Sequence, residues 1–431
     1  MVAESNYRVK LIPMDRPLRI AVWYNLPSGG AKRALYNHLK GLKSRGHTIE
    51  AFRPPIESEE FTPIAEVSDK EHVIPWPSWE GTAKFPLARI YETTTQVHRY
   101  VQAAETHAQD AAVEIHKGGF DLLFANTCLQ FHSPFIGRYV KLPKLLYLQE
   151  PKRPFYEPMP RLPWIAKDSQ PVTGLRKLRT AATEMVDLRS VSIQGREELN
   201  NARSFDQILV NSFFSREALL RAYGISAKVC YLGTDPGKFK DLGLPRENFV
   251  MGIGTLGPSK NVRLAVEGVG QVPKQIRPKL IWVANMTSAP YKEECVSLAR
   301  DLNVDFEAKE MISDDELVSL LNRASAMVYA PRLEPFGFAP LEANFCRLPV
   351  VAVAEGGVRE TVVDGLNGLL VDHDPEKLGA AITKLLSDEP LRARLGEQGY
   401  RIAYEKWGVD ASVDRLEREI QTLLRQSAPS A

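Results

Sequence analysis

Short apolar runs recur along the first half of the chain, and most have the length of a buried strand. The first run, 18–24, precedes a Gly-rich turn at 25–30 and a helical pattern that continues through Leu42. A second run at 48–52 completes a strand–helix–strand unit. Further runs of this kind lie at 121–125, 145–149, 207–210 and 229–232. The pattern predicts an open α/β sheet in this half of the chain.

A second alternating series of strand-length runs and helical patterns fills the rest of the chain. Its strands are expected at 249–254, 280–284, 304–307, 326–330, 350–353 and 369–371. The fold class is therefore α/β, with two Rossmann-like, doubly wound domains. Segment 235–248 holds two prolines, two glycines and few apolar residues, which is typical of a linker.

These patterns predict an N-terminal domain over 1–240, a C-terminal domain over 241–405 and a last helix over 406–431. The last helix has Val413, Leu416, Ile420 and Leu423 on one face, and we expect it to return to the first domain. Two segments interrupt the first series and are expected to be insertions. They cover about 54–119, with a long helix near 87–116, and about 151–203, rich in Pro and Arg.

Composition adds limits on the partners and the compartment. The charges nearly cancel, with 55 Lys+Arg against 53 Asp+Glu, so no global field favours nucleic acid or a membrane surface. Four widely separated cysteines lack metal-type spacing and indicate reduced, packed thiols. The chain has no apolar signal region near residue 1 and no run of about 18 apolar residues. We expect a cytoplasmic protein without a nucleic-acid partner, and peripheral membrane contact stays open.

Gly252, Gly254 and Gly257 form a G-x-G-x-x-G pattern at the end of a predicted strand. A nicotinamide site also needs an acid about 20 residues later, and here the next strand is followed by Asn285. The pattern therefore favours a phosphate-facing turn, where amides at a helix start suit a pyrophosphate and Lys260 adds a full charge. A nucleotide-dependent oxidoreductase stays open as an alternative.

Glu334 and Glu342 stand on either side of a Gly/Pro turn that leads into a predicted helix. Pro340 fits the first turn of that helix, and Glu342 is expected within the same turn. Taken alone, the pair is better explained by a contact with the helix dipole and a solvated loop acid than by catalysis. Its context changes this interpretation.

The stretch around the two acids resembles the retaining glycosyltransferases of family 4, which have the two-domain GT-B fold. The matching runs are Glu334-Pro-Phe-Gly-Phe-Ala-Pro-Leu-Glu342, Pro349-Val-Val-Ala-Val353, Gly356-Gly-Val-Arg-Glu360 and Asp364-Gly-Leu-Asn-Gly368-Leu-Leu-Val371. Weaker matches are Ser28-Gly-Gly30, Phe120-Asp-Leu-Leu, Asn211-Ser212, Gly233-Thr-Asp235 and 254–260. The resemblance implies two Rossmann-like domains that face a cleft. It also implies metal-independent transfer of a hexose, with retention, from a UDP- or GDP-sugar to an acceptor hydroxyl in glycan or glycoconjugate synthesis.

The resemblance also assigns roles to single residues. Glu334 would face the hydroxyls of the transferred sugar, and Glu342 would hold the ribose of the nucleotide. Lys260 would neutralise the leaving diphosphate, and with Glu334 it is the expected catalytic pair. The expected donor-binding residues are Gly29, Gly30, Gly254, Thr255, Lys260, Glu334, Phe336, Gly337, Phe338, Ala339 and Glu342. Fixed donors and a cation of this kind stabilise the charge that develops on a leaving diphosphate.

Two positions depart from the family pattern. Thr255 stands where the family commonly has an Arg, so part of the diphosphate clamp is missing, and Arg359 or an arginine of the first domain is a candidate replacement. Asn126 stands where the family often has a His. These departures keep a catalytically silent GT-B protein, which binds a nucleotide sugar or a glycan, as a second alternative.

The acceptor is expected on the first domain, where open α/β sheets place ligand loops after their strands. The acceptor-side candidates are Asn126, Gln149, Glu150 and Arg153. Between 152 and 203, ten Lys/Arg stand against six Asp/Glu, which suits an anionic or lipid-linked acceptor and equally a solvated helical loop. We therefore expect a sugar, glycan or lipid-linked acceptor.

No metal is expected. Asp372 and Asp374 form a D-x-D pair, but Asp374 followed by Pro375 fits a helix N-cap and N1 proline better than a metal site. Ser313 and Glu316 fit a capping box in the same way.

Overall fold

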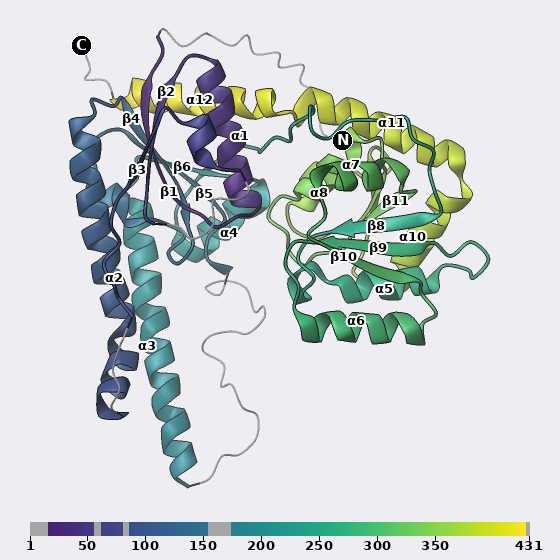
Figure 1. The fold of residues 1–431 in the computed structure, drawn as a ribbon, viewed down its shortest axis with the longest axis horizontal. Helices are drawn as coiled ribbons and strands as arrows, with labels where there is room; N and C mark the ends of the chain where they lie inside the picture. Colours follow the sequence, from purple (N-terminus) through teal and green to yellow (C-terminus); the bar gives the residue numbers. More distant parts are fainter. Residues whose placement is uncertain (1–15, 56–61, 81–85, 154–173, 428–431) are drawn as a thin grey trace. The chain divides into compact units, whose positions relative to one another are not determined.

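The computed structural model describes residues 16–55, 62–80, 86–153 and 174–427. Two separate sheets form within these residues (Figure 1). The chain divides into two compact units around them. Unit 1 comprises Met1–Leu209, Ala218–Cys230 and Ser412–Ala431, and unit 2 comprises Val210–Glu217 and Tyr231–Ala411. Residues 154–173 of the second expected insertion lie outside the described residues.

The sheet of unit 1 has seven strands in the order β3-β2-β1-β4-β5-β6-β7. They are β1 (Arg19–Asn25), β2 (Thr48–Arg53), β3 (Lys70–Val73), β4 (Leu122–Cys128), β5 (Lys144–Gln149), β6 (Gln207–Val210) and β7 (Lys228–Val229). β1 pairs in parallel with both β2 and β4, and β4 pairs in parallel with β5. The strand order therefore reverses between β1 and β4, and open α/β sheets bind ligands at the carboxyl ends of the strands at such a point.

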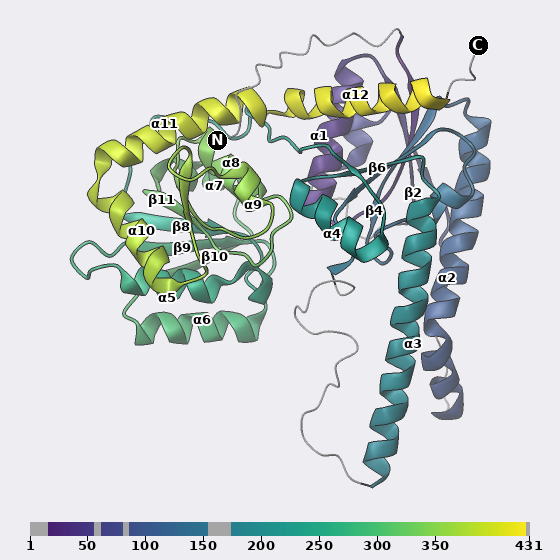
Figure 2. The same cartoon turned by 180° about the vertical axis from the view of Figure 1, so that it is seen from behind.

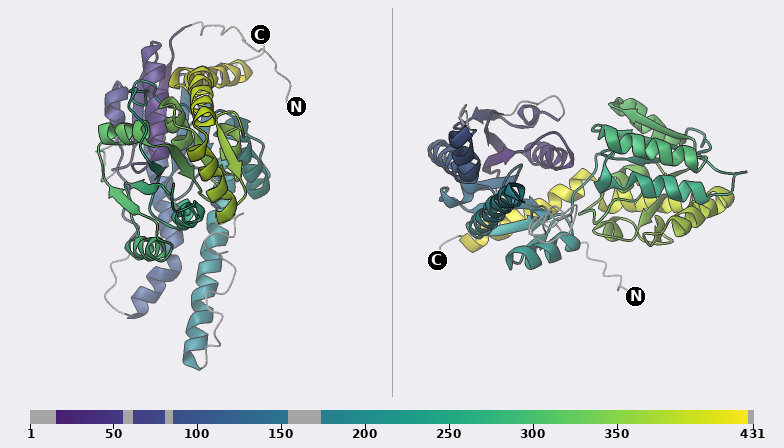
Figure 3. Two further views of the ribbon diagram at one scale, coloured as in Figure 1. Left: turned by 90° about the vertical axis from the view of Figure 1, so that its right-hand side faces the viewer. Right: turned by 90° about the horizontal axis from the view of Figure 1, so that it is seen from below.

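The helices of this part of the chain include two long ones that run side by side (Figures 1, 2 and 3). The helices are α1 (Gly30–Ser44), α2 (Pro86–Lys117), α3 (Leu175–Arg203), α4 (Phe213–Tyr223) and α12 (Val409–Ser427), with short turns η1 (Ile64–Val67) and η2 (Phe135–Arg138). The long helix expected near 87–116 is confirmed as α2. Segment 54–119 is not a simple insertion, because it supplies the edge strand β3 and the helix that connects β3 to β4. β3 reads Lys-Glu-His-Val and is partly exposed, so it has no apolar run by which to predict it.

The last helix, α12, packs on α1 within unit 1. A Cβ placed on Gly41 would meet the Val413 side chain, so the absence of a side chain at 41 allows this close approach. The buried imidazole of His38 and the Ser412 hydroxyl share a hydrogen bond of 2.8 Å. Arg45 forms an ion pair with Glu417 beside them.

The sheet of unit 2 has six parallel strands in the order β10-β9-β8-β11-β12-β13. They are β8 (Phe249–Ile253), β9 (Lys279–Ala284), β10 (Phe306–Glu310), β11 (Ala326–Tyr329), β12 (Val350–Val353) and β13 (Gly368–Val371). The helices are α5 (Val262–Gln271), α6 (Ala289–Asp301), α7 (Asp314–Arg323), α8 (Phe338–Phe345), α9 (Val358–Thr361), α10 (Pro375–Ser387) and α11 (Glu389–Lys406), with the single turn η4 (Pro258–Lys260). The order reverses between β8 and β11, so the second switch point lies at the carboxyl ends of these strands.

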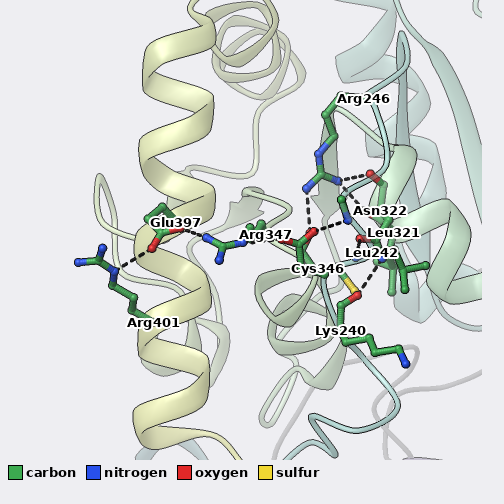
Figure 4. Close-up of polar contacts among 11 residues, drawn as sticks. Lys240, Leu242, Arg246, Leu321, Asn322, Cys346, Arg347, Glu397 and Arg401 are labelled. Atoms are coloured by element: carbon green, nitrogen blue, oxygen red, sulfur yellow. Dashed lines mark hydrogen bonds and ion pairs between the residues drawn. The ribbon is translucent and has the colours of Figure 1, made fainter.

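The expected linker, 235–248, is bonded to unit 2 along its second half. The guanidinium of Arg246 donates to four carbonyl oxygens at 2.8 to 3.2 Å (Figure 4). These carbonyls belong to Leu321, Asn322, Ala324 and Cys346. Leu321 and Asn322 lie in the last turn of α7, and Ala324 and Cys346 are the C-caps of α7 and α8, so Arg246 satisfies carbonyl groups that helix ends leave without partners.

Two helix caps expected from the sequence are confirmed. The side chain of Ser313 accepts from the amide of Glu316 at the start of α7. The side chain of Asp374 accepts from the amides of Glu376 and Lys377 at the start of α10. All four cysteines are buried and free.

Candidate active site

The Gly-rich segment forms the turn that follows β8 in unit 2. Gly254 has a φ of +143°, and its carbonyl accepts from the indole of Trp282 at 2.9 Å. A Cβ on Gly254 would lie 3.1 Å from Cγ of Lys260, so glycine at this position leaves room for the lysine stem. Lys260 ends η4, and the left-handed Asn261 leads on into α5. The turn thus places the Lys260 side chain over the carboxyl end of β8.

The two residues expected as the catalytic pair meet, although 74 positions separate them in the sequence. Lys260 Nζ donates to Oε2 of Glu334 at 2.6 Å. Their side chains are 25% and 18% exposed, so the pair is shielded from most of the solvent but still open to a ligand. Such a charge-assisted hydrogen bond fixes both side chains more firmly than an exposed pair would.

Two glycines hold the loop that carries Glu334. The amide of Gly357 donates to the carbonyl of Glu334 at 2.7 Å. A Cβ on Gly356 would lie 2.4 Å from that carbonyl oxygen, and a Cβ on Gly357 would lie 2.0 Å from the carbonyl oxygen of Pro335. Because backbone atoms cannot move aside as a flexible side chain can, only glycine fits at these two positions. The Gly-Gly pair expected from the family resemblance therefore fixes the backbone of the expected catalytic acid.

Helix α8 begins directly after this loop. Gly337, at φ +91°, is its N-cap and supplies no side-chain hydrogen bond. The amides of the first turn, which include those of Phe338 and Ala339, therefore point out of the helix without an intrahelical acceptor. Glu342 is the fifth residue of α8, so the expectation that it lies in the first turn was wrong. Its side chain is only 2% exposed. The ring of Phe336 is buried edge-on against that of Phe338.

Thr255 lies in the turn after β8, and two arginines lie near the Glu334 loop. The amide of Arg332 donates to the carbonyl of Ser259, the neighbour of Lys260, at 3.2 Å. Arg359, the replacement considered from the sequence, donates from Nε to the carbonyl of Gly356 at 3.0 Å. Sequence reasoning missed Arg332, and the only available signal was its position two residues before Glu334.

Glu360, the last residue of the Gly-Gly-Val-Arg-Glu run, caps another helix. Its carboxylate accepts from the amides of Phe213 and Phe214 at 2.9 and 3.0 Å and from the Tyr231 hydroxyl at 2.8 Å. The carboxylate thereby satisfies two amides at the start of α4 and places a negative charge at the N-terminus of this helix. This part of the sequence motif therefore has a structural role within unit 2.

In unit 1, Gly29 and Gly30 lie at the N-terminus of α1, and the other candidates lie on β4, on β5 or just after β5. Gly29 is the N-cap of α1, and a Cβ on it would meet nothing within 4 Å. Gln149 has a φ of +66°, and its amide nitrogen lies 3.5 Å from the carbonyl oxygen of Ala31, beside Gly30. Asn126 is 1% exposed, and its Nδ2 has no hydrogen-bond partner among the described residues. The carboxyl end of β5 thus places the amide group of Gln149 beside the start of this helix.

Glu150 and Arg153 form an ion pair of 2.9 Å after β5. A buried acid from α3 holds the neighbouring loop: Glu198 accepts from the amides of His132 and Ser133 at 2.7 and 2.8 Å. Burial raises the pKa of Glu198 and lowers the pKa of His132. Sequence reasoning missed Glu198, because 66 positions separate it from His132 and it lies in an expected insertion.

The structure divides the expected site residues between the units. Gly29, Gly30, Asn126, Gln149, Glu150 and Arg153 belong to unit 1, and the other candidates belong to unit 2. In the described part of the chain, no group of three or more His, Cys, Asp and Glu side chains is arranged as a metal site. No described helix is long and apolar enough to cross a membrane.

Comparison with known families decides how this arrangement is classified. Residues 234–402 match the family described as Glycosyl transferases group 1. These residues form a group 1 glycosyltransferase domain. The resemblance inferred from the sequence motifs is confirmed, and the group 1 domain contains both Lys260 and Glu334.

Curated relatives agree with the group 1 assignment. Human alpha-1,3/1,6-mannosyltransferase ALG2 is 28% identical over 245 residues, which cover 51% of this chain and 59% of the human protein. D-inositol 3-phosphate glycosyltransferase of Thermomonospora curvata is 27% identical over 288 residues, or 59% of this chain and 67% of that protein. The match thus spans less than two thirds of the length of ALG2.

Solved structures match nearly the whole chain. Anabaena Alr3699/HepE in complex with UDP-glucose has a TM-score of 0.65 at 20% identity, covering 94% of this chain and all of that one. Sucrose-phosphate synthase of Thermosynechococcus elongatus has a TM-score of 0.66 at 18% identity, covering 95% and 100%. The chain therefore has the GT-B fold, as the sequence predicted. The sheet of unit 1 lies outside the group 1 domain, and the sheet of unit 2 lies inside it.

Proposed function

We propose that this chain transfers a hexose from a UDP- or GDP-sugar to an acceptor hydroxyl, with retention of configuration and without a metal. The observation that supports it most is the Lys260–Glu334 pair, held at 2.6 Å by two glycine-dependent loops at the switch point of unit 2. A cation and an acid that are fixed together suit a donor with a charged diphosphate on one side and sugar hydroxyls on the other.

The donor half of the proposal follows from the groups around this pair. The uncapped first turn of α8 offers backbone amides, which stabilise anionic oxygens as a helix N-terminus generally does. Lys260 uses one of its N–H groups on Glu334 and keeps others for a phosphate oxygen. Glu334 accepts through Oε2, so its second oxygen can accept from a sugar hydroxyl. Glu342 is proposed to hold the ribose from its place on α8.

The proposed reaction breaks the bond between the anomeric carbon and the leaving phosphate oxygen, and forms a bond from that carbon to the acceptor oxygen on the same face. The acceptor proton moves to the leaving phosphate oxygen. No side chain then has to act as a strong base, and the chain contributes fixed positive charge and amide donors where negative charge develops. Lys260 supplies the full charge in this scheme.

The acceptor is proposed to bind unit 1 at the carboxyl ends of β4 and β5. The buried Nδ2 of Asn126 has no hydrogen-bond partner in the described residues, and an acceptor oxygen bound at the end of β4 would satisfy it. Gln149, Glu150 and Arg153 surround the end of β5 with polar groups. The names of the relatives support a sugar or glycan acceptor, because one is a D-inositol 3-phosphate glycosyltransferase and another is a mannosyltransferase. A lipid-linked acceptor is part of the proposal on the composition of segment 152–203 alone.

A stereochemical assay tests this proposal. The purified chain is incubated with UDP-glucose or GDP-mannose and a panel of glycoside and inositol phosphate acceptors, and the anomeric configuration of the product is read by proton NMR. We expect a product with the configuration of the donor, formed at the same rate with and without EDTA. An inverted product contradicts retention, and loss of activity in EDTA that returns with a divalent cation contradicts metal independence. Donor binding without transfer or hydrolysis favours the catalytically silent alternative.

A further inference from the structure

A diphosphate donor carries more negative charge than the catalytic lysine alone can balance. Lys260 is already paired with Glu334, so the net charge of that pair is zero. Thr255, in the turn after β8, brings no charge. The proposed site in unit 2 therefore needs a further cation close to Lys260.

The backbone of Arg332 is fixed next to Lys260. Its amide donates to the carbonyl of Ser259 at 3.2 Å, and Ser259 directly precedes the lysine. Arg332 is also two residues before Glu334, whose carboxylate holds the lysine ammonium. An arginine side chain that starts from this point is long enough to reach a group bound at Lys260.

The guanidinium of Arg332 is only partly engaged. Nε lies 3.1 Å from Oε2 of Glu355, but the two atoms are not aligned as a hydrogen bond, and each is buried without a hydrogen-bond partner in the described residues. The side chain as a whole is 38% exposed. Its two terminal nitrogens have no partner in the described part of the chain, so they remain free to bind two phosphate oxygens side by side.

Arg359 is the other arginine near the Glu334 loop, and its position is less suited to this role. Its Nε donates to the carbonyl of Gly356 within its own turn. In the described residues, no backbone hydrogen bond joins it to the segment that carries Lys260. It therefore serves as a matched control for Arg332.

We propose that Arg332 binds the donor diphosphate through its terminal nitrogens and takes the place of the arginine that Thr255 replaces. This inference rests on the proposed function, since it concerns the same donor site. The planar guanidinium takes phosphate oxygens with its terminal nitrogens, and Glu355 restrains the side chain through Nε. Glu334 and Glu355 offset the charges of Lys260 and Arg332 in the free chain, so what Arg332 adds for the leaving diphosphate is the pair of N–H donor groups on its terminal nitrogens.

Calorimetric titration of the full chain with UDP, GDP, UMP and GMP tests this inference. We expect Arg332→Gln to weaken binding of the preferred nucleoside diphosphate by about tenfold or more, the usual effect of losing a charged hydrogen bond. Binding of the matching monophosphate should weaken much less. Arg332→Lys should lie between wild type and Arg332→Gln, and Arg359→Gln should bind as wild type does. Adding Thr255→Arg to Arg332→Gln should restore much of the lost affinity.

The outcomes separate the inference from the function on which it rests. If wild type binds neither UDP nor GDP, the proposed function fails and the inference fails with it. If wild type binds one of them and Arg332→Gln binds it equally well, only the inference is wrong. Equal losses for diphosphate and monophosphate, or a loss in Arg359→Gln as large as in Arg332→Gln, also overturn it. Thermal melts without ligand identify a variant that does not fold, and Arg332→Lys then carries the test.

Discussion

The two sheets of this chain carry their candidate residues in different ways. In unit 2, Glu334 stands on a loop packed so closely against Gly356 and Gly357 that a Cβ on either glycine would overlap backbone atoms. The turn that carries Lys260 depends on Gly254, which has a positive φ and leaves room for the lysine stem. In unit 1, the carboxyl ends of β4 and β5 are supported by buried polar groups, such as Glu198 from α3. Gly29, at the equivalent turn after β1, has open space where a Cβ would be.

This difference explains why the sequence reveals one region and not the other. A loop that must follow one backbone path needs particular residues at fixed spacing, and so it leaves a motif. A loop supported by a side chain from a distant helix needs only that one side chain, which leaves no local pattern. The comparison predicts that unit 2 tolerates little change at its glycines, whereas the first turn of unit 1 accepts a methyl group.

The largest expected effect comes from the charged pair. Lys260→Met and Glu334→Gln should each lower kcat/KM for the donor by about 10²–10³-fold, the usual result of removing one group that stabilises transition-state charge. Lys309→Met is the matched control, because Lys309 also pairs with acids of unit 2, Glu316 and Glu307, and belongs to no proposed site. Steady-state kinetics measure this, and near-normal rates in both site variants contradict the assignment of the pair.

The next effect compares glycines of the two units directly. Gly357→Ala should destabilise the protein by about 1–3 kcal/mol, because its Cβ would overlap the carbonyl oxygen of Pro335. Gly29→Ala, with open space around its Cβ, should change the free energy of unfolding by less than about 0.5 kcal/mol. Denaturant titrations measure both, and equal losses would remove the distinction between the two loops.

Unit 1 has its own tight glycine, at the contact between α1 and α12. Gly41→Ala should cost about 1–2 kcal/mol of stability, because the added Cβ meets Val413. Adding Val413→Ala should recover part of this loss, because it removes the atoms that the new Cβ meets. A double-mutant cycle read by thermal unfolding gives the coupling, and strict additivity would show that the two residues do not interact.

A smaller, pH-dependent effect is expected at the same contact. Burial, together with the nearby charge of Arg415, lowers the pKa of His38 to about 3. The unfolded histidine titrates near 6.5, so this stabilisation is complete above that pH and is lost as the pH falls toward 3. At pH 5 the loss is about 1–2 kcal/mol. His38→Gln should flatten the stability curve between pH 6.5 and 4, and parallel curves for the two proteins contradict the assignment.

Much of the fold was predictable because its central strands are continuous apolar runs. β6 and β12 begin and end at the predicted residues, and both are buried along their whole length. β3 and β10 are edge strands with charged residues on partly exposed positions, so β3 was missed and β10 was placed too early. The helix α2 was also predictable, because one of its faces is buried and its apolar residues therefore recur with the 3.6-residue period.

The candidate site was predictable only where function forces a sequence motif. The Glu334 loop and its Gly-Gly partner could be recognised because backbone contacts dictate both. Arg332 could not be recognised in this way. Its role depends on the carbonyl to which its amide donates and on the restraint of its side chain by Glu355. Glu198 could not be predicted either. It lies on α3, whereas the two amides from which it accepts belong to His132 and Ser133 in a distant loop.

The central claim is that the group 1 domain binds a nucleoside diphosphate sugar, and a thermal-shift panel tests it most directly. The panel holds UDP, GDP, ADP, their common sugars and NAD(H), because a ligand that binds only the folded state raises the melting temperature. We expect a rise with UDP or GDP and the matching sugar, and none with NAD(H). A rise with NAD(H) alone, or no rise with any nucleoside diphosphate, would contradict it.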